Sequence, residues 1–206
     1  MEDHNMTKIL IIGATGTVGS KTRQYLLENS MDELTLMARN TRRLGTLNSD
    51  RERAVTGSVT DPTALADALA GQDVVFAALS GNLPQMAEAL VTAMDKAQVK
   101  RLLFITSMGI YNEIPASVGA SGNLDANPML GNYRRAADVV EGSDLNYTVI
   151  RPGWFDNGDD LNYEVTKKGQ PFGGHDVSVK SIADLVMRLA HDDTLGARDS
   201  LGINRK

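Results

Sequence analysis

The sequence predicts a single α/β domain in which helices cover both faces of a doubly wound parallel sheet. Apolar segments recur along the 206 residues with helical stretches between them, which is the pattern of such a sheet. The first apolar run, residues 9–12, is uninterrupted, as in a strand buried on both faces. A glycine turn, residues 13–19, follows it directly. With 42% hydrophobic residues, residues 1–206 are expected to form one domain around one core.

Six strands are expected from the apolar runs. They lie at residues 9–12, 34–37, 54–56, 73–79, 102–107 and 147–150. The last strand is expected to stop at Arg151-Pro152-Gly153.

The helices are expected between these strands. The first covers residues 18–29, and the second begins with Asp61 as N-cap and Pro62 at the first helical position. The next has an apolar stripe, and its members are Met86, Leu90, Met94 and Ala97. Another helix covers roughly residues 133–141.

The last helix is expected to start with a capping box formed by Ser181 and Asp184. Its apolar face consists of Ile182, Leu185, Val186 and Leu189.

Two segments, around residues 108–133 and 153–180, are expected to be small substrate or lid segments. The first has little periodicity and contains Pro115, Gly119, Gly122, Pro128 and Gly131. Loops of this length usually have a function or are disordered.

The composition excludes several classes of function. The chain has no cysteine, which removes disulfide scaffolds, thiolate zinc sites and cysteine nucleophiles. A net charge of −5 and a pI of about 5.2 argue against nucleic acid or an anionic membrane as a partner. His4, His175 and His191 have no metal-ligand spacing, so no metal is expected. The aspartate doublets at 159–160 and 192–193 are expected to be solvated.

Residues 1–5 are acidic and polar where a secretory signal would be basic and then apolar. In addition, no apolar run approaches the length of a membrane span. These features predict a cytoplasmic protein, and we expect a monomer or a weak homodimer.

The glycine turn predicts a dinucleotide site. Gly13, Gly16 and Gly19 lie between a strand and a helix, where one glycine permits the tight turn, one lets a pyrophosphate approach the backbone and one packs helix on strand. The amides at the start of the helix would bind the anion. The alternative is a glycine turn that only packs.

The end of the second strand indicates which nicotinamide cofactor is preferred. NAD selection uses a carboxylate here, whereas NADP selection uses a cation for the 2′-phosphate. Residues 38–43 contain no acid, and Arg39 supplies a planar fork of donors. NADP(H) is therefore expected to be preferred over NAD(H), with a solvated basic turn as the alternative.

Five segments together resemble the atypical short-chain dehydrogenase/reductases. They are residues 13–19, 38–39, 57–61, 104–107 and 147–153. Within that superfamily the chain is most similar to the small NAD(P)H-binding, NmrA-like proteins, a group that includes flavin reductases and biliverdin reductase B. The resemblance covers nearly the whole chain and implies a Rossmann-like sheet with strand order 3-2-1-4-5-6, sometimes with an added edge strand.

The resemblance also implies roles for individual residues. The cofactor-binding residues are Gly13, Thr15, Gly16, Thr17, Val18, Arg39, Arg43, Ser58, Val59, Ala77, Ala78, Leu79, Thr106, Pro152 and Gly153. The segment from Thr15 to Val18 would hold the pyrophosphate, and Arg39 and Arg43 would hold the 2′-phosphate and the adenine face. Ser58 stands where the family has an adenine-contacting aspartate.

The catalytic signature of the larger superfamily is absent from the sequence. Classical members use a tyrosine followed four residues later by a lysine that lowers the pKa of the phenol. Tyr133 is followed by Ala137 and Tyr111 by Pro115 at that spacing. Epimerase or dehydratase chemistry therefore lacks its base.

Ser107 matches the family's active-site serine. Its hydroxyl would orient the nicotinamide or the acceptor, or else it ends the strand by bonding local backbone. A flat apolar slot for an aromatic acceptor is expected near it, formed by Met108, Ile110, Tyr111, Trp154 and Phe155.

The leading hypothesis is an NADPH-dependent reductase that passes hydride to a flavin, a quinone or a similar small planar acceptor. Such acceptors take their protons from solvent and do not need the missing base. The alternative is a non-catalytic NADP(H) sensor of the NmrA type.

Overall fold

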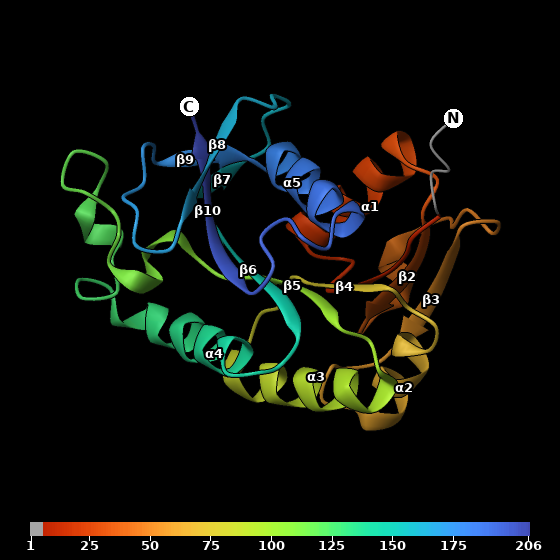
Figure 1. Ribbon diagram of the computed structural model, residues 1–206. Coiled ribbons are helices and arrows are strands. Elements are labelled where there is room, and N and C mark those ends of the chain that lie inside the picture. Colours follow the sequence, from red (N-terminus) through yellow and green to blue (C-terminus); the bar gives the residue numbers. More distant parts are fainter. Residues whose placement is uncertain (1–5) are drawn as a thin grey trace.

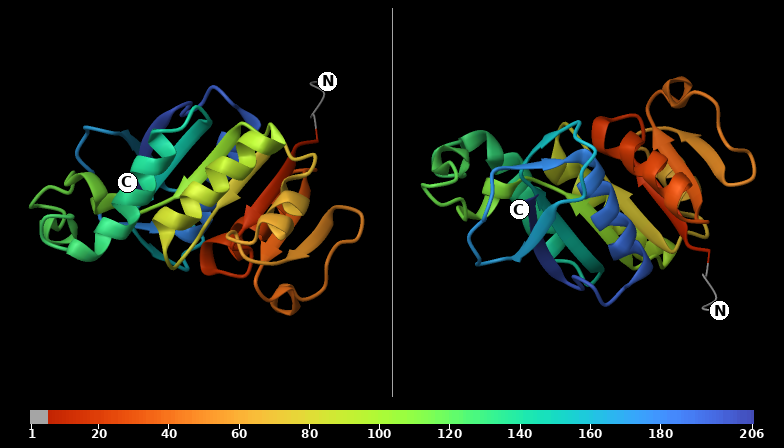
Figure 2. Two further views of the ribbon diagram at one scale, coloured as in Figure 1. Left: turned by 90° about the horizontal axis from the view of Figure 1, so that it is seen from below. Right: turned by 90° about the horizontal axis from the view of Figure 1, so that it is seen from above.

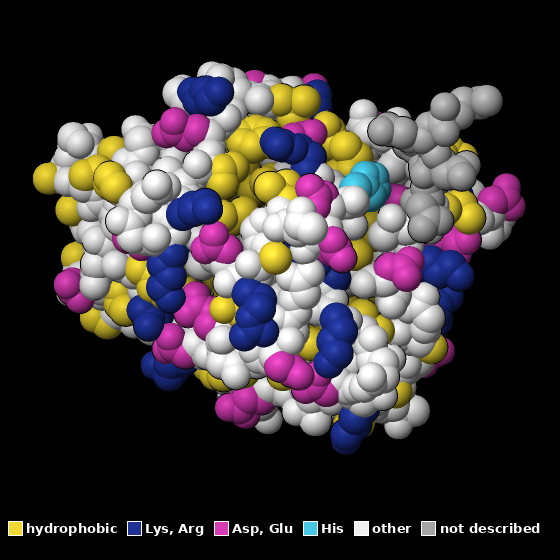
Figure 3. Space-filling view, in the orientation of Figure 1, with side chains coloured by type: hydrophobic (Ala, Val, Ile, Leu, Met, Phe, Trp, Pro, Cys, Tyr) yellow, Lys and Arg dark blue, Asp and Glu magenta, His cyan; other side chains and the backbone are white. Residues whose placement is uncertain are grey.

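The computed structural model describes residues 6–206, which form one α/β domain (Figure 1). Residues 1–5, on which the interpretation of the polar chain start rests, lie outside the described residues, and so does His4. On the face in Figure 3, basic and acidic side chains are interspersed. No helix among residues 6–206 has both the length and the apolar character to cross a membrane.

An eight-stranded sheet runs through the domain in the order β3-β2-β1-β4-β5-β6-β10-β8. Neighbouring strands are parallel, except that β8 is antiparallel to β10. The strands are β1 (Lys8–Ile12), β2 (Glu33–Ala38), β3 (Glu52–Thr56), β4 (Val74–Ala77), β5 (Arg101–Ile105), β6 (Asn146–Pro152), β8 (Tyr163–Lys167) and β10 (Asp199–Arg205). The predicted order 3-2-1-4-5-6 is confirmed.

Helices cover both faces of this sheet, as predicted. On one face α1 (Thr17–Asn29) and α5 (Val179–His191) pack side by side. The other face carries α2 (Pro62–Leu69), α3 (Leu83–Ala97) and α4 (Gly131–Glu141). Figure 2 shows the second group from below and the first from above.

The first strand shows why both faces must be apolar. Ile9 and Ile11 are completely buried in the cluster that includes residues of α1 and α5. Leu10 and Ile12 point the other way, into the cluster that includes residues of α2, α3 and α4. Alternate residues of a strand point to opposite faces, so an uninterrupted apolar run fills two cores at once.

The last helix begins three residues earlier than the predicted capping box. Its N-cap is Ser178, whose hydroxyl accepts a hydrogen bond from the Ser181 amide at 2.9 Å. Asp184 instead accepts from the phenols of Tyr25 (2.8 Å) and Tyr163 (2.5 Å). The pKa of each tyrosine is raised to about 12, mainly because the phenol is buried and secondly because it donates to Asp184. The prediction was wrong because Asp184 joins α1 to β8 and does not cap its own helix.

The apolar stripe of α3 is also shifted from its predicted place. Its buried members are Leu83, Ala87, Leu90 and Met94. Of the other predicted members, Ala97 is exposed at the end of the helix and Met86 is half-buried.

The carboxyl-terminal third contains strands that the apolar pattern does not reveal. β6 continues to Pro152, past its predicted end at Ile150, and places Arg151 in the core with no exposed surface. Arg151 pairs with Glu113 and donates to the Ser200 hydroxyl at 3.0 Å. β10 then adds to the sheet beside β6, and a two-stranded sheet forms from β7 (Trp154–Asp156) and β9 (Asp176–Ser178).

Asp61 caps α2, as predicted, and this role can be tested by stability. Its carboxylate accepts from the amides of Thr63 (3.0 Å) and Ala64 (3.2 Å). We expect Asp61→Ala to lower the free energy of unfolding by about 1 kcal/mol, because two amides lose their partner. Asp61→Asn retains the cap and serves as the control. Urea unfolding measures both variants, and equal stabilities would contradict the capping role.

Candidate functional site

A cavity of about 440 Å³ opens where β1, β2 and β4 reach their carboxyl ends. It is lined by Ile12, Gly13, Thr15, Gly16, Thr17, Met37, Ala38, Arg39, Asn40, Arg43, Gly57, Ser58, Val59, Ala78, Leu79, Ser80 and Met86. The strand order reverses between β1 and β4, and ligands of open α/β sheets bind at this point.

The three glycines of the turn meet different surroundings. Gly13 has a φ of +85°, and a Cβ there would lie 2.1 Å from the Ala78 carbonyl oxygen. At Gly19 a Cβ would lie 2.3 Å from the Gly13 carbonyl oxygen. Gly16 meets only that oxygen, at 3.3 Å, and lines the cavity. Two glycines therefore permit close packing of the backbone, and the third leaves the helix start open.

The start of α1 offers unpaired amides to the cavity. Gly16 is its N-cap and makes no side-chain hydrogen bond, and the first turn contains no acidic residue. The first amides of a helix have no partner within the helix and carry partial positive charge. This end of the cavity is therefore suited to a phosphate group.

Two arginines border the cavity at the end of β2. The side chains of Arg39 and Arg43 are exposed, and neither guanidinium has a hydrogen bond or an ion pair within residues 6–206. The nearby Arg23 guanidinium, by contrast, is engaged by Glu52 at 2.5 Å. Arg39 and Arg43 are thus free to bind an anion.

A third wall of the cavity follows β3. Val59 is 4% exposed and presents an apolar surface, while the Ser58 hydroxyl lies 2.9 Å from that of Thr60. Asn40 and Met86 also line the cavity, although neither was among the predicted cofactor-binding residues. The position of Asn40 directly after Arg39 was a signal for it, whereas Met86 reaches the site from α3 and gave none.

Five of the predicted cofactor-binding residues do not line the cavity, and two of these are Val18 and Ala77. Val18 is 8% exposed and packs in the core beneath α1, and Ala77 is completely buried within β4. Only their backbones could act toward a ligand.

Four further predicted residues lie along the same edge of the sheet, after β5 and at the end of β6. Thr106 and Pro152 are buried, and the Thr106 hydroxyl donates to the Ile150 carbonyl at 3.1 Å. Gly153 leaves no room for a side chain, because a Cβ would lie 2.6 Å from the His175 carbonyl oxygen. The Ser107 side chain is half-buried and makes no hydrogen bond within residues 6–206. Its hydroxyl is therefore not used to end the strand.

The predicted apolar slot does not form. Met108 and Ile110 are buried, at 3% and 0% exposed. Trp154 and Phe155 lie at the surface instead, at 64% and 47% exposed. The prediction treated neighbours in sequence as one surface, but the short helix after β5 turns Met108 and Ile110 into the interior.

A lysine lies close to Tyr111 in space, but it does not lower the pKa of the phenol. The Lys168 ammonium lies 4.2 Å from the centre of its ring, while its hydroxyl donates to Glu141. Burial and then this bond to Glu141 raise the pKa of Tyr111 well above its usual value. The lysine also pairs with Glu141, at 2.7 Å. The phenol consequently keeps its proton at neutral pH.

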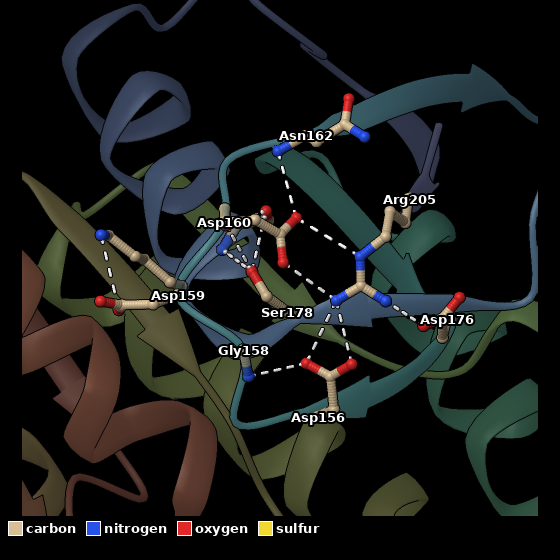
Figure 4. A network of polar contacts seen from close by, with 10 residues as sticks. Asp156, Gly158, Asp159, Asp160, Asn162, Asp176, Ser178 and Arg205 are labelled. Atoms are coloured by element: carbon tan, nitrogen blue, oxygen red, sulfur yellow. Dashed lines mark hydrogen bonds and ion pairs between the residues drawn. The ribbon is translucent and has the colours of Figure 1, made fainter.

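The loop after β7 is held by a cluster around Arg205 (Figure 4). The guanidinium pairs with Asp156 at 2.9 Å, with Asp160 at 3.0 Å and with Asp176. Asp159 points away from Arg205, and its side chain is 79% exposed. The prediction that Asp159 and Asp160 are both solvated is therefore right for Asp159 and wrong for Asp160, which belongs to the cluster. No group of carboxylates and histidines within residues 6–206 has an arrangement that could hold a metal ion.

Comparisons with known proteins agree with the fold and identify the family. A family profile described as NAD(P)H-binding matches residues 13–193. An NAD(P)H azoreductase from Xenophilus azovorans is 30% identical over 149 residues, which is 71% of this chain and 48% of that enzyme. The chain thus spans about half the length of this relative.

Two solved structures illustrate the structural likeness. A Rossmann-fold NAD(P)-binding protein from Shigella flexneri has a TM-score of 0.83 and 32% identity, and the match covers 98% of this chain and 94% of that one. A short-chain dehydrogenase/reductase from Veillonella parvula, in complex with NADP, has a TM-score of 0.89, 25% identity, and coverage of 97% and 94%. The predicted resemblance to short-chain dehydrogenase/reductases is confirmed.

Alanine substitutions separate the roles of Gly13 and Gly16. We expect Gly13→Ala to lower the free energy of unfolding by about 2 kcal/mol or more, because it combines a left-handed φ with a clash against Ala78. Gly16 has a φ of −81°, so Gly16→Ala should melt close to the wild type but bind dinucleotide more weakly. Thermal melting and cofactor titration check this pair. Equal melting temperatures for the two variants would contradict it.

Proposed function

Because this chain belongs to the NAD(P)H-binding family of Rossmann-fold oxidoreductases, we propose that it is a reductase that transfers hydride from NADPH to a flavin, a quinone or a similar planar acceptor. One observation carries the proposal. The cavity has unpaired helix amides near Gly16 at one end and two unpaired guanidinium groups at the other. A dinucleotide with a pyrophosphate and a further phosphate matches both features.

The residues would divide the cofactor between them. The segment from Thr15 to Val18 would hold the pyrophosphate through its unpaired amides, whereas the Gly16 amide donates to the Gly13 carbonyl at 2.9 Å and holds the close turn. Arg39 and Arg43 would bind the 2′-phosphate and cover the adenine. Val59 would pack against the adenine ring, and Ser58 would lie at its border. No carboxylate lines this end of the cavity, so nothing there repels the phosphate.

The reacting end would lie farther along the same edge of the sheet. The backbone from Ala77 to Leu79 would pass the ribose, and the segments at Thr106 and at Pro152-Gly153 would flank the nicotinamide. The unbonded Ser107 hydroxyl would donate to the nicotinamide amide or to an acceptor oxygen and fix its orientation.

The chemistry needs little more from the protein. The bound cofactor supplies a hydride, and the acceptor gains this hydride together with one proton from solvent. The residues of this chain bind and orient the two partners. The segments 108–133 and 153–180 would border the acceptor and limit the access of water.

Arg39 tests the cofactor preference. In thermal-shift titrations we expect NADP⁺ to stabilise the wild type more than NAD⁺, because only NADP⁺ carries the phosphate for the guanidinium. Arg39→Ala should remove the difference, and Arg42→Ala should preserve it. Arg42 is an exposed neighbour that does not line the cavity, which makes it the matched control. Equal shifts for both cofactors in the wild type would contradict this use of Arg39.

Turnover tests the reaction itself. We expect the purified protein to oxidise NADPH when a flavin or a quinone is added, and Ser107→Ala to slow this by about tenfold at saturating NADPH. Absorbance at 340 nm measures the rate. Intact NADPH binding without turnover of any flavin or quinone would exclude the reductase and favour the sensor.

A further inference from the structure

Two lysines from different helices converge on one oxygen of Asp159. The Lys180 ammonium lies 3.4 Å from Asp159 Oδ1, and the Lys21 ammonium lies 3.7 Å from the same atom. The lysine side chains are 28% and 31% exposed, whereas the aspartate is 79% exposed. The cations are thus partly enclosed by the fold, and the anion between them comes from a surface loop.

The loop backbone on both sides of Asp159 is fixed by other contacts (Figure 4). Arg205 binds the carboxylates of Asp156 and Asp160. The hydroxyls of Ser178 and Ser181 donate to the Asp160 carbonyl at 2.7 and 2.9 Å. Asp159 contributes nothing to this cluster, so its carboxylate can leave the lysines while the loop keeps its place.

The ion pairs between Asp159 and the two lysines are weak. Exposed ion pairs contribute about 0–1 kcal/mol, because water and salt compete for both charges. In addition, one carboxylate faces two ammonium groups, so one positive charge stays unmatched at this point. An incoming anion can therefore replace Asp159 at little cost.

The two lysines lie on the side of the molecule where the acceptor is proposed to bind. Lys21 is on α1 and Lys180 is on α5, and both helices begin at the edge of the sheet where the cavity opens. Neither lysine lines the cavity itself. The loop that carries Asp159 follows β7, and β7 comes directly after Gly153 at the end of β6, on the side proposed for the nicotinamide and the acceptor.

We propose that Lys21 and Lys180 form an anion subsite for a phosphate or carboxylate group on a side chain of the planar acceptor, and that Asp159 occupies this subsite when no acceptor is bound. This inference rests on the proposed reductase function and deepens it. It makes acidic acceptors better substrates than neutral acceptors with the same ring system.

Riboflavin and its 5′-phosphate, FMN, are the probes, because they share one ring and differ only in the anion. With the wild type we expect the KM for FMN to be about tenfold lower than for riboflavin. The double variant Lys21→Gln/Lys180→Gln should raise the KM for FMN to that for riboflavin, and leave the KM for riboflavin and the Kd for NADPH unchanged. Asp159→Asn should lower the KM for FMN, because the competing carboxylate is gone.

Lys96→Gln is the control, because Lys96 is an exposed lysine on α3, on the opposite face of the sheet. It should change none of these values. An equal loss for both flavins, or no loss for either, would overturn the subsite. A weaker Kd for NADPH in the double variant would assign the lysines to the cofactor's phosphates instead and also overturn it.

Binding separates this inference from the proposed function. Quenching of flavin fluorescence reports the affinity for FMN and for riboflavin in the presence of NADP⁺, whether or not hydride is transferred. Selective binding of FMN that depends on the two lysines, without turnover, would retain the subsite and reject the reductase. Turnover of both flavins with equal affinity would retain the reductase and reject the subsite.

Discussion

The close approach of two backbone segments, the turn after β1 and the end of β4, is the constraint on which the site depends. The Gly13 Cα faces the Ala78 carbonyl so closely that no side chain fits between them. From the same turn, the Gly13 and Ala14 amides donate to the Met37 carbonyl at 3.1 and 3.3 Å. Three neighbouring strand ends are thereby joined at the point where α1 begins, and the direction of its free amides is set by this contact.

Much of the fold follows from local patterns in the amino-terminal two thirds of the chain. Residues 9–12 could be recognised because both faces of β1 are buried, which requires an unbroken apolar run. β10 could not, because its sequence mixes Asp199, Ser200 and Asn204 with apolar residues. Two of these side chains have distant partners, because Arg151 donates to the Ser200 hydroxyl and the Asn204 amide donates to Glu164. Pairings of this kind leave no mark at a fixed spacing.

The residues of the candidate site show the same difference between local patterns and distant contacts. The glycine turn and Arg39 could be found from sequence, because their positions relative to the first two strands restrict what they can do. Met86 could not, since its arrival at the cavity depends on how α3 packs. The prediction of an apolar slot was wrong because residues close together in sequence do not face the same way. Met108 and Trp154 are each near the expected edge, yet one side chain turns inward and the other outward. Burial at such places is decided by tertiary packing.

The side-by-side packing of α1 and α5 also bears on the order in which this molecule can fold. Tyr25 and Asp184 are separated by 159 positions and still form a hydrogen bond. The core beneath α1 and α5 needs residues from both helices, so it cannot close until nearly the whole polypeptide has been assembled. Contacts between such remote segments slow folding, because a large loop must be ordered before they form. An incomplete chain that ends before α5 would leave Leu26 and Ile11 exposed to water, and such a fragment would tend to aggregate.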